Sequence, residues 1–212
     1  MRGDGNMDFL EFVNKDLPTI QGWCSADKAL KFIEIINDIK PDLCLEIGVF
    51  GGSSLIPQAI ALKENGKGLV YGIDPWCNHS AIEEMENQAN KEWWGGLDLN
   101  QVYLHCKYNI ERFGVEDYCK LLKNKSIDVI DQFADNSIDI LHIDGNHCEK
   151  LAYEDSVNYF PKVKSGGYIF FDDISWSENG SEISTQKGLN FLRQYCEELG
   201  VVGKDCMVLQ KN

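Results

Sequence analysis

The sequence is short of positive charge and of long apolar runs. Its 212 residues carry 20 Lys and Arg against 34 Asp and Glu, which gives a net charge of −14. No cluster of basic residues offsets this charge locally, so nucleic-acid phosphates and anionic lipid surfaces would be repelled. Every apolar run is also far shorter than a bilayer span. We therefore expect neither nucleic acid nor membrane as a partner.

Paired cysteine motifs are absent as well. The eight cysteines are scattered singly, several of them inside apolar runs, and none has the Cys or His spacing of a zinc site. The first residues, MRGDGNMDFLEF, lack the basic and apolar regions of a secretion signal. We expect reduced, buried thiols in a cytoplasmic protein.

The pattern that is present is an alternation of short strands and helices, without repeats or low-complexity linkers. Helices are expected over 27–38, 55–63, the crossover within 150–167, and 188–200; strands are expected over 43–48, 69–74, 137–143, 167–171 and 206–212. The runs SIDILHI and GYIFF are almost continuously apolar, as in parallel strands covered on both faces. The sequence therefore predicts an α/β fold of Rossmann type: a doubly wound, mostly parallel sheet, helices on both faces, and an antiparallel edge strand at the C-terminus.

Acidic residues follow the predicted strands. Glu46, Asp74, Asp144 and the pair Asp172–Asp173 all fall at or just beyond strand ends. In a parallel sheet these ends share one rim, where ligands bind. Two adjacent carboxylates repel each other unless something positive lies near them. Turn chemistry could account for one such acid, but five favour a binding site.

The stretch EIGVFGGSS, residues 46–54, links the first predicted strand to a helix through a glycine-rich turn. Such a turn lets the backbone approach a ligand closely. Its spacing differs from the G-x-G-x-x-G dinucleotide fingerprint, and Glu46 would repel a pyrophosphate and attract a cationic ligand. Asp74, at the end of the next strand, stands where an acid accepts ribose hydroxyls. Alternatively, Glu46 bonds to a neighbouring backbone and Asp74 merely starts a turn.

LEIGVFGGSS with YGIDPW, followed by LHIDGNH and SGGYIFFDDI, resembles the ordered motifs of class I S-adenosylmethionine-dependent methyltransferases over about residues 41–212. The likeness is greatest to the metal-dependent small-molecule O-methyltransferase branch, which includes macrocin-type sugar enzymes and catechol-type enzymes. It implies that Asp74 binds the ribose and that Lys125 and Ser126 border the adenine. The other cofactor contacts it implies are Glu46, Gly48, Gly51, Gly52 and Ser53 around the methionine, with Trp76 and Asp144.

The same resemblance implies a metal site. Asp144, Asp172 and Asp173 match the family's ligands, and three carboxylates suit Mg²⁺ or a similar divalent cation. Asp173 departs from catechol-type enzymes, which often carry Asn there. His147 stands where those enzymes place a catalytic lysine, and imidazole suits proton abstraction near neutral pH. In the alternative interpretation, His147 caps the following helix or orients Asp144.

These features predict methyl transfer to a hydroxyl of a small molecule of sugar or natural-product type. Residues 1–40 are expected to form a helical cap that covers the site or makes a homodimer contact, and the aromatic-rich segment 76–117 a helical lid. Two alternatives are an NAD-type oxidoreductase, which should show the tighter glycine fingerprint, and a non-catalytic nucleoside-binding protein, which has no need of the acids and the histidine.

Overall fold

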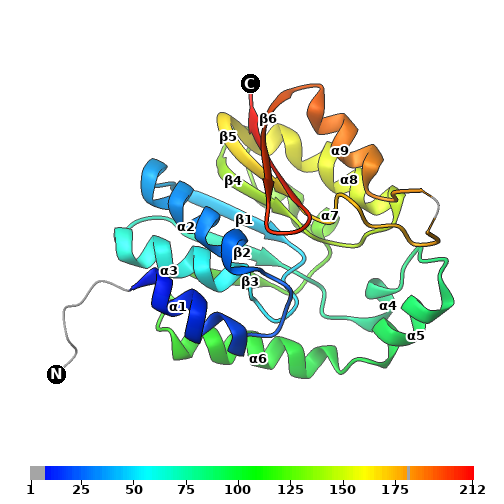
Figure 1. Cartoon of the computed structure of the whole chain (residues 1–212), viewed down its shortest axis with the longest axis horizontal. Coiled ribbons are helices and arrows are strands. Elements are labelled where there is room, and N and C mark those ends of the chain that lie inside the picture. Colours follow the sequence, from blue (N-terminus) through cyan, green and yellow to red (C-terminus); the bar gives the residue numbers. More distant parts are fainter. Residues whose placement is uncertain (1–7, 181) are drawn as a thin grey trace.

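The computed structural model describes residues 8–180 and 182–212, and its centre is a seven-stranded sheet with the order β3-β2-β1-β4-β5-β7-β6 (Figure 1). β1 to β5 pair in parallel, whereas β7 runs antiparallel to both β5 and β6. The strands are β1 (Leu43–Ile47), β2 (Leu69–Ile73), β3 (Cys119–Leu122), β4 (Ile138–Ile143), β5 (Val163–Phe171), β6 (Cys196–Val202) and β7 (Cys206–Lys211). The Rossmann-like prediction is confirmed.

Helices cover both faces of the sheet (Figure 1). On one face the core includes side chains of α1 (Phe9–Lys15), α2 (Ala26–Ile39), α3 (Leu55–Asn65) and α6 (Leu99–Arg112). On the other it includes side chains of α7 (Ser126–Val129), α8 (Glu149–Tyr159) and α9 (Gln186–Arg193). Three short 3₁₀ turns lie at Leu17–Thr19, Ile130–Gln132 and Phe160–Lys162. The central strands are therefore apolar on both sides, as the continuous apolar runs predicted.

Helix α2 shows how local sequence sets an element. The Ser25 side chain caps it by accepting a bond from the backbone N–H of Lys28 at 3.2 Å. Phe32 and Ile36 are fully buried one and two turns after Lys28, whose own side chain is also buried. The helix ends at Ile39, and the capping residue Lys40 has left-handed geometry with φ 46°. The buried face of α2 thus includes one lysine, Lys28, among its apolar side chains.

The C-terminal region differs from its predicted structure. The helix expected over 188–200 is α9, which ends at Arg193, and Cys196 begins β6 instead. β6 pairs with β7 along its length and forms the edge of the sheet, so the C-terminal strand β7 is antiparallel as predicted but lies inside the sheet. Leu199 is 45% exposed on this edge strand, so it never belonged to a core-facing helical stripe. Strand pairing overrides the helical pattern here.

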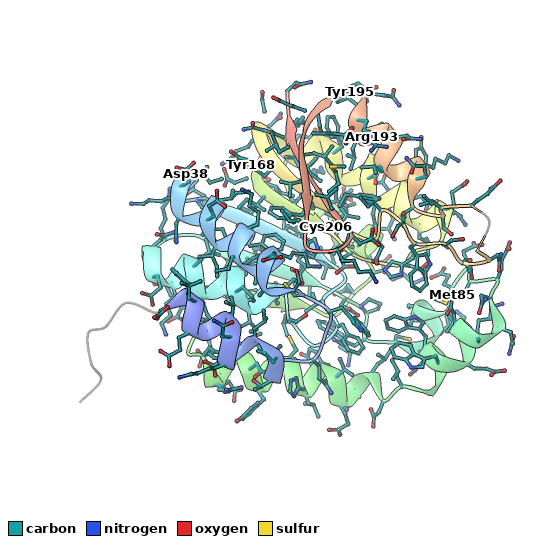
Figure 2. The ribbon with its side chains drawn as sticks, viewed as in Figure 1. Asp38, Met85, Tyr168, Arg193, Tyr195 and Cys206 are labelled. Carbon is teal, nitrogen blue, oxygen red and sulfur yellow. The ribbon has the colours of Figure 1, made fainter. Side chains whose placement is uncertain are left out.

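The segment expected as a lid divides into two parts. α4 (Asn78–Ala81) and α5 (Gln88–Gly96) project beyond the sheet on the right of Figure 1, and Met85 lies there in Figure 2. α6 instead belongs to the core, where its Cys106 is completely buried. Among the described residues, no helix is both long enough and apolar enough to cross a membrane.

Candidate active site

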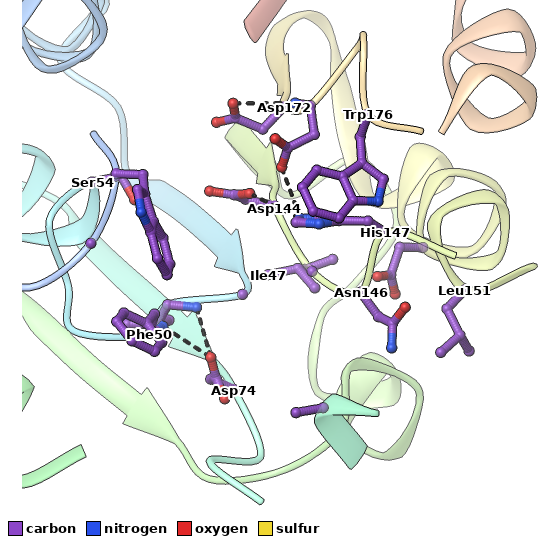
Figure 3. A pocket seen from close by; sticks show the side chains of 18 of the residues that line it. Ile47, Phe50, Ser54, Asp74, Asp144, Asn146, His147, Leu151, Asp172 and Trp176 are labelled. Carbon is purple, nitrogen blue, oxygen red and sulfur yellow. Dashed lines mark hydrogen bonds and ion pairs between the residues drawn. The ribbon is translucent and has the colours of Figure 1, made fainter. Parts of the chain in front are cut away.

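A cavity of about 910 Å³ opens at the carboxyl ends of β1, β2, β4 and β5 (Figure 3). The predicted residues that line it are Gly48, Ser53, Asp74, Trp76, Lys125, Ser126, Asp144, His147, Asp172 and Asp173. The parallel sheet brings these positions together because its first five strands end at one rim. The cavity also receives side chains from α2, α4, α5 and α8.

Asp74 is held by the glycine-rich loop. Its Oδ2 accepts the backbone N–H groups of Val49 and Phe50, both at 3.0 Å, and its Oδ1 accepts that of Trp76 at 2.7 Å (Figure 3). Burial raises the pKa of Asp74, and these three bonds oppose the rise. A carboxylate oxygen has two lone pairs, so Oδ2 is fully used by the two loop N–H groups, while Oδ1 keeps acceptor capacity. This fixed acid can accept a ribose hydroxyl.

Three residues at the cavity have left-handed backbones although none is glycine. Phe50 has φ 50°, Trp76 has φ 42° and Asp173 has φ 56°. Such conformations cost free energy in residues with a Cβ and persist where surrounding contacts enforce them. The Trp76 indole N–H donates to the Phe50 carbonyl at 2.8 Å, which ties two of them together. Three residues of the cavity lining thus have strained backbones.

Glu46 lies beneath the cavity, where it is fully buried. Its Oε1 accepts from the Ser54 hydroxyl at 2.9 Å, and its Oε2 accepts from the Gln58 side chain at 2.7 Å. His142 Nδ1 lies 3.0 Å from the same Oε2, and the other ring nitrogen lies 2.9 Å from Asp172 Oδ2. Burial lowers the pKa of His142, but the two carboxylates outweigh it and raise that pKa to about 9. His142 thus connects the first strand to the acid pair.

Lys28 supplies a second buried positive charge. Its ammonium group donates to Asp172 Oδ2 and lies 3.9 Å from Asp144 Oδ2. Burial alone would lower the pKa of Lys28, yet Asp144 and Asp172 hold it above its usual value. Conversely, His142 and Lys28 overcome the effect of burial on Asp172 and keep its pKa below the usual range. Two side-chain cations therefore allow Asp172 to stay ionised beside Asp173.

His147 faces the other half of the acid cluster. Its Nε2 lies 2.8 Å from Asp173 Oδ2 and 3.8 Å from Asp144 Oδ1, and its ring contacts Trp176 with centroids 4.9 Å apart (Figure 3). Burial opposes a charged ring, but the carboxylates of Asp144 and Asp173 raise the pKa of His147 to about 10. The pKa of Asp144 rises to about 6 because it is buried near Asp172.

Within the described residues, the potential metal-binding side chains form two groups. One comprises Asp144, His147 and Asp173, and the other comprises His142, Asp172 and Cys206. The three predicted ligands are thus close but divided between the groups. Asp172 Oδ2 already meets two cationic donors, while its Oδ1 accepts the Asp173 backbone N–H at a long 3.3 Å. The carboxylates of Asp144, Asp172 and Asp173 still offer free lone pairs, and that donor set fits a hard divalent cation.

Lys125 and Ser126 border the far end of the cavity, after β3. The Lys125 ammonium pairs with Glu83 at 2.6 Å, and the Ser126 hydroxyl donates to Asp155 Oδ1 at 2.5 Å. Burial raises the pKa of Asp155 to about 7, which makes it a half-protonated carboxyl near neutral pH. This end offers a hydroxyl, an ammonium and a carboxyl group, which are suitable for recognising a nucleobase edge.

Gly51 and Gly52, like Glu46, do not reach the cavity wall. A Cβ on Gly51 would meet the Gln21 carbonyl at 2.4 Å, and one on Gly52 would meet Cys106 Sγ at 2.9 Å. Close packing of the loop against the protein therefore explains both glycines.

Sequence reasoning missed Lys28, His142 and Asp155. A lysine on the apolar face of a helix and a histidine inside the apolar strand SIDILHI were usable signals. Buried polar groups need partners, so each signal pointed to a partner elsewhere in the chain.

Residues 45–174 match the family model described as a methyltransferase domain. An uncharacterized protein of Acanthamoeba polyphaga mimivirus is 34% identical over 142 residues, covering 65% of this chain and 56% of the relative. Caffeoyl-CoA O-methyltransferase 1 of Eucalyptus globulus is 27% identical over 184 residues, covering 82% of this chain. The match spans less than two thirds of that enzyme's length, namely 63%.

Solved structures share the fold. The O-methyltransferase NovP superposes with a TM-score of 0.70 at 16% identity, over 89% of this chain and 81% of NovP. TomG of Streptomyces achromogenes, an O-methyltransferase solved in complex with S-adenosylmethionine, gives a TM-score of 0.64 at 16% identity, over 98% of this chain and 90% of TomG.

Proposed function

Because the chain belongs to the methyltransferase-domain family, we propose that it transfers the methyl group of S-adenosylmethionine to a hydroxyl of a small molecule. One observation carries this proposal: a single cavity joins Asp74 and the glycine loop to the His147–Asp173–Asp144 group. The first set suits an adenosyl cofactor, and the second suits activation of a hydroxyl.

The cofactor would lie along the ends of β1, β2 and β3. Asp74 would accept a ribose hydroxyl, Gly48 and Ser53 would face the methionine, and Lys125 and Ser126 would border the adenine. A sulfonium is cationic, and the acids of the cavity favour a cation. Asp144 lies between this region and the acid pair.

Methyl transfer is an in-line displacement, so a hydroxyl oxygen must be held near the methyl group and lose its proton. We assign proton acceptance to the ring nitrogen of His147 that does not face Asp173, because Nε2 lies 2.8 Å from Asp173 Oδ2 and donates to it; Asp173 and Trp176 orient the ring. Asp144, Asp172 and Asp173 would hold a divalent cation, which when bound supplies positive charge that lowers the pKa of a hydroxyl. Without that cation, the carboxylates of Asp144 and Asp173 stabilise the imidazolium and raise the pKa of His147.

The two alternative functions, an NAD-type oxidoreductase and a nucleoside-binding protein, find less support. An NAD-type oxidoreductase would place a pyrophosphate against the loop, yet the loop lacks the dinucleotide glycine pattern. A non-catalytic nucleoside-binding protein would not require His147 beside the acids Asp144 and Asp173. This proposal keeps four further predictions: a helical cap over residues 1–40, of which 1–7 lie outside the described residues, a helical lid insertion over about 76–117, a cytoplasmic location and a homodimer contact.

Replacing His147 tests the assignment. His147→Ala should lower turnover by roughly 10²–10⁴-fold, the usual contribution of a positioned base, while S-adenosylhomocysteine binding is kept. Turnover is measured as S-adenosylhomocysteine released with a panel of phenols and sugars, and binding by calorimetry. His79→Ala, an exposed histidine outside the cavity lining, is the matched control. Full activity in His147→Ala would remove this histidine from the mechanism.

A further inference from the structure

The cavity has an aromatic wall formed by Trp23, Phe50, Trp93 and Trp94. The Trp23 ring lies 4.9 Å from Phe50, Trp93 lies 4.9 Å from Trp94, and Phe50 lies 5.9 Å from Trp94. Three separate segments supply these rings: the chain before α2, the glycine loop and helix α5. Their convergence on one wall of one cavity makes a continuous apolar surface.

Part of this wall faces solvent. Trp23 is 66% exposed and Trp93 is 49% exposed, although both belong to the aromatic cluster. Large apolar rings clustered at a cavity mouth mark a place where an apolar ligand buries surface. Trp176, whose ring contacts His147, continues the aromatic lining toward the proposed base. A flat ring on this wall would therefore sit in the cavity that contains His147.

The remaining lining is acidic. Among the described residues, eight carboxylates and four lysines line the cavity, and no arginine does. Lys28 pairs with Asp172, Lys125 with Glu83 at 2.6 Å, and Lys150 with Glu84 at 2.7 Å. In the part of the chain that the structure describes, Lys204 is the one lining lysine without an ion pair. A ligand with several phosphates would meet uncompensated carboxylates.

The size of the cavity also argues against an acceptor as large as an acyl-CoA. About 910 Å³ lies near the upper end of the range for ligand sites, roughly 300–1,000 Å³. That volume holds an adenosyl cofactor together with a small ring, and leaves an extended acyl-CoA tail outside the cavity, against a protein of net charge −14. The exposed charged residues of the lining are Glu154, Lys204 and Lys150, of which Lys150 is paired with Glu84.

We propose, on the basis of the methyltransferase function above, that the acceptor is an uncharged or cationic compound with a flat hydroxyl-bearing ring that packs on the Trp23–Phe50–Trp93–Trp94 wall, and that polyanionic acyl thioesters are rejected. The acceptor class thus differs from the one named in the caffeoyl-CoA relatives. The aromatic wall selects the ring and the acidic lining selects its charge.

A series of acceptors with one shared ring and different charge tests this proposal. Dopamine, 4-methylcatechol, caffeate and caffeoyl-CoA carry the same dihydroxyphenyl group with a charge that changes from positive to strongly negative. Protein saturated with S-adenosylhomocysteine is titrated with each compound, followed by tryptophan fluorescence and by calorimetry. Dopamine and 4-methylcatechol should bind at least about tenfold more tightly than caffeate, and caffeoyl-CoA most weakly.

Tighter binding of caffeoyl-CoA, or binding of none of the four compounds, would overturn the acceptor proposal. Failure of S-adenosylhomocysteine itself to bind would overturn the methyltransferase proposal instead, so the two failures are distinguishable.

Two variants, each with a control, separate the contribution of the aromatic wall from that of the acidic lining. Trp93→Leu should weaken 4-methylcatechol binding at least about fivefold and leave S-adenosylhomocysteine binding unchanged, whereas Tyr108→Leu, an exposed aromatic outside the cavity, should change neither. Glu154→Lys should narrow the ratio between dopamine and caffeate affinities. Glu116→Lys makes the same change of net charge at an exposed position outside the lining, and should leave the ratio as it is. Equal effects of each variant and its control would contradict the proposal.

Discussion

Burial controls the proton affinity of Asp155, and this has a consequence for stability. Its pKa is raised to about 7 in the folded protein, against an ordinary value near 3.8. The folded state therefore holds this proton more tightly than the unfolded state, so the free energy of unfolding falls as pH rises from about 4 to about 7.

Asp155→Asn should remove this dependence. Between pH 5 and pH 7 the wild type should lose about 1.4 kcal/mol per pH unit relative to the variant, and the difference should level off above pH 7. Urea unfolding at several pH values measures both curves. Parallel curves across the whole range would show that Asp155 titrates normally.

Lys28 and Asp172 form the most consequential ion pair of the site. Their side chains are 7% and 10% exposed, so removing the ammonium would leave a buried, ionised carboxylate opposite His142 alone. Lys28→Met should lower the free energy of unfolding by about 3–5 kcal/mol, the usual cost of breaking a buried pair. Lys31→Met, which removes an exposed pair with Glu34 on the same helix, should cost less than about 1 kcal/mol in the same urea titration. Similar losses in both variants would contradict this account.

At the scale of elements, regular hydrophobic periodicity made much of the fold predictable. α2, β1, α3 and β2 follow from their apolar patterns, and each lies within a few residues of its predicted range. β6 could not be predicted in this way, because the apolar residues of GLNFLRQYCEELG also fit one face of a helix. Only the pairing with β7 identifies its second half as a strand. The partnership of Lys28 with Asp172 likewise depends on contacts 144 residues apart, which no local pattern contains.

Gly48 is a sensitive position because the glycine-rich loop that follows β1 closely approaches the backbone just after β4. Its φ is +83°, and a Cβ there would lie 1.9 Å from the Asp144 backbone oxygen. Gly48→Ala should therefore displace Asp144 or the loop and abolish S-adenosylhomocysteine binding, as measured by calorimetry. Gly66→Ala is the matched control, because Gly66 has φ +63° but nothing within 4 Å of a Cβ. The control should cost about 1 kcal/mol of stability and bind the ligand normally. Normal binding by both variants would show that this approach is not needed for the site.

At the scale of the whole molecule, the parallel sheet turns separate short motifs into one cavity. Asp74, Asp144, Asp172 and Asp173 follow β2, β4 and β5; the sheet order places β2 and β4 on either side of β1, and β5 next to β4. Of the five acids predicted to converge at one rim, these four line the cavity, whereas Glu46 is buried and is not part of its lining. Two positive charges accompany them: Lys28 of α2 lies outside the predicted motifs, whereas His142 of β4 lies inside the LHIDGNH motif but had no predicted role.

Calorimetric titration with S-adenosylhomocysteine, run with Mg²⁺ and again with EDTA, decides whether the cavity binds an adenosyl cofactor. We expect one binding site per chain in both conditions, a separate heat with Mg²⁺, and at least about tenfold weaker ligand binding in Asp74→Asn. No binding by the wild type in either condition would show that the cavity is not a cofactor site.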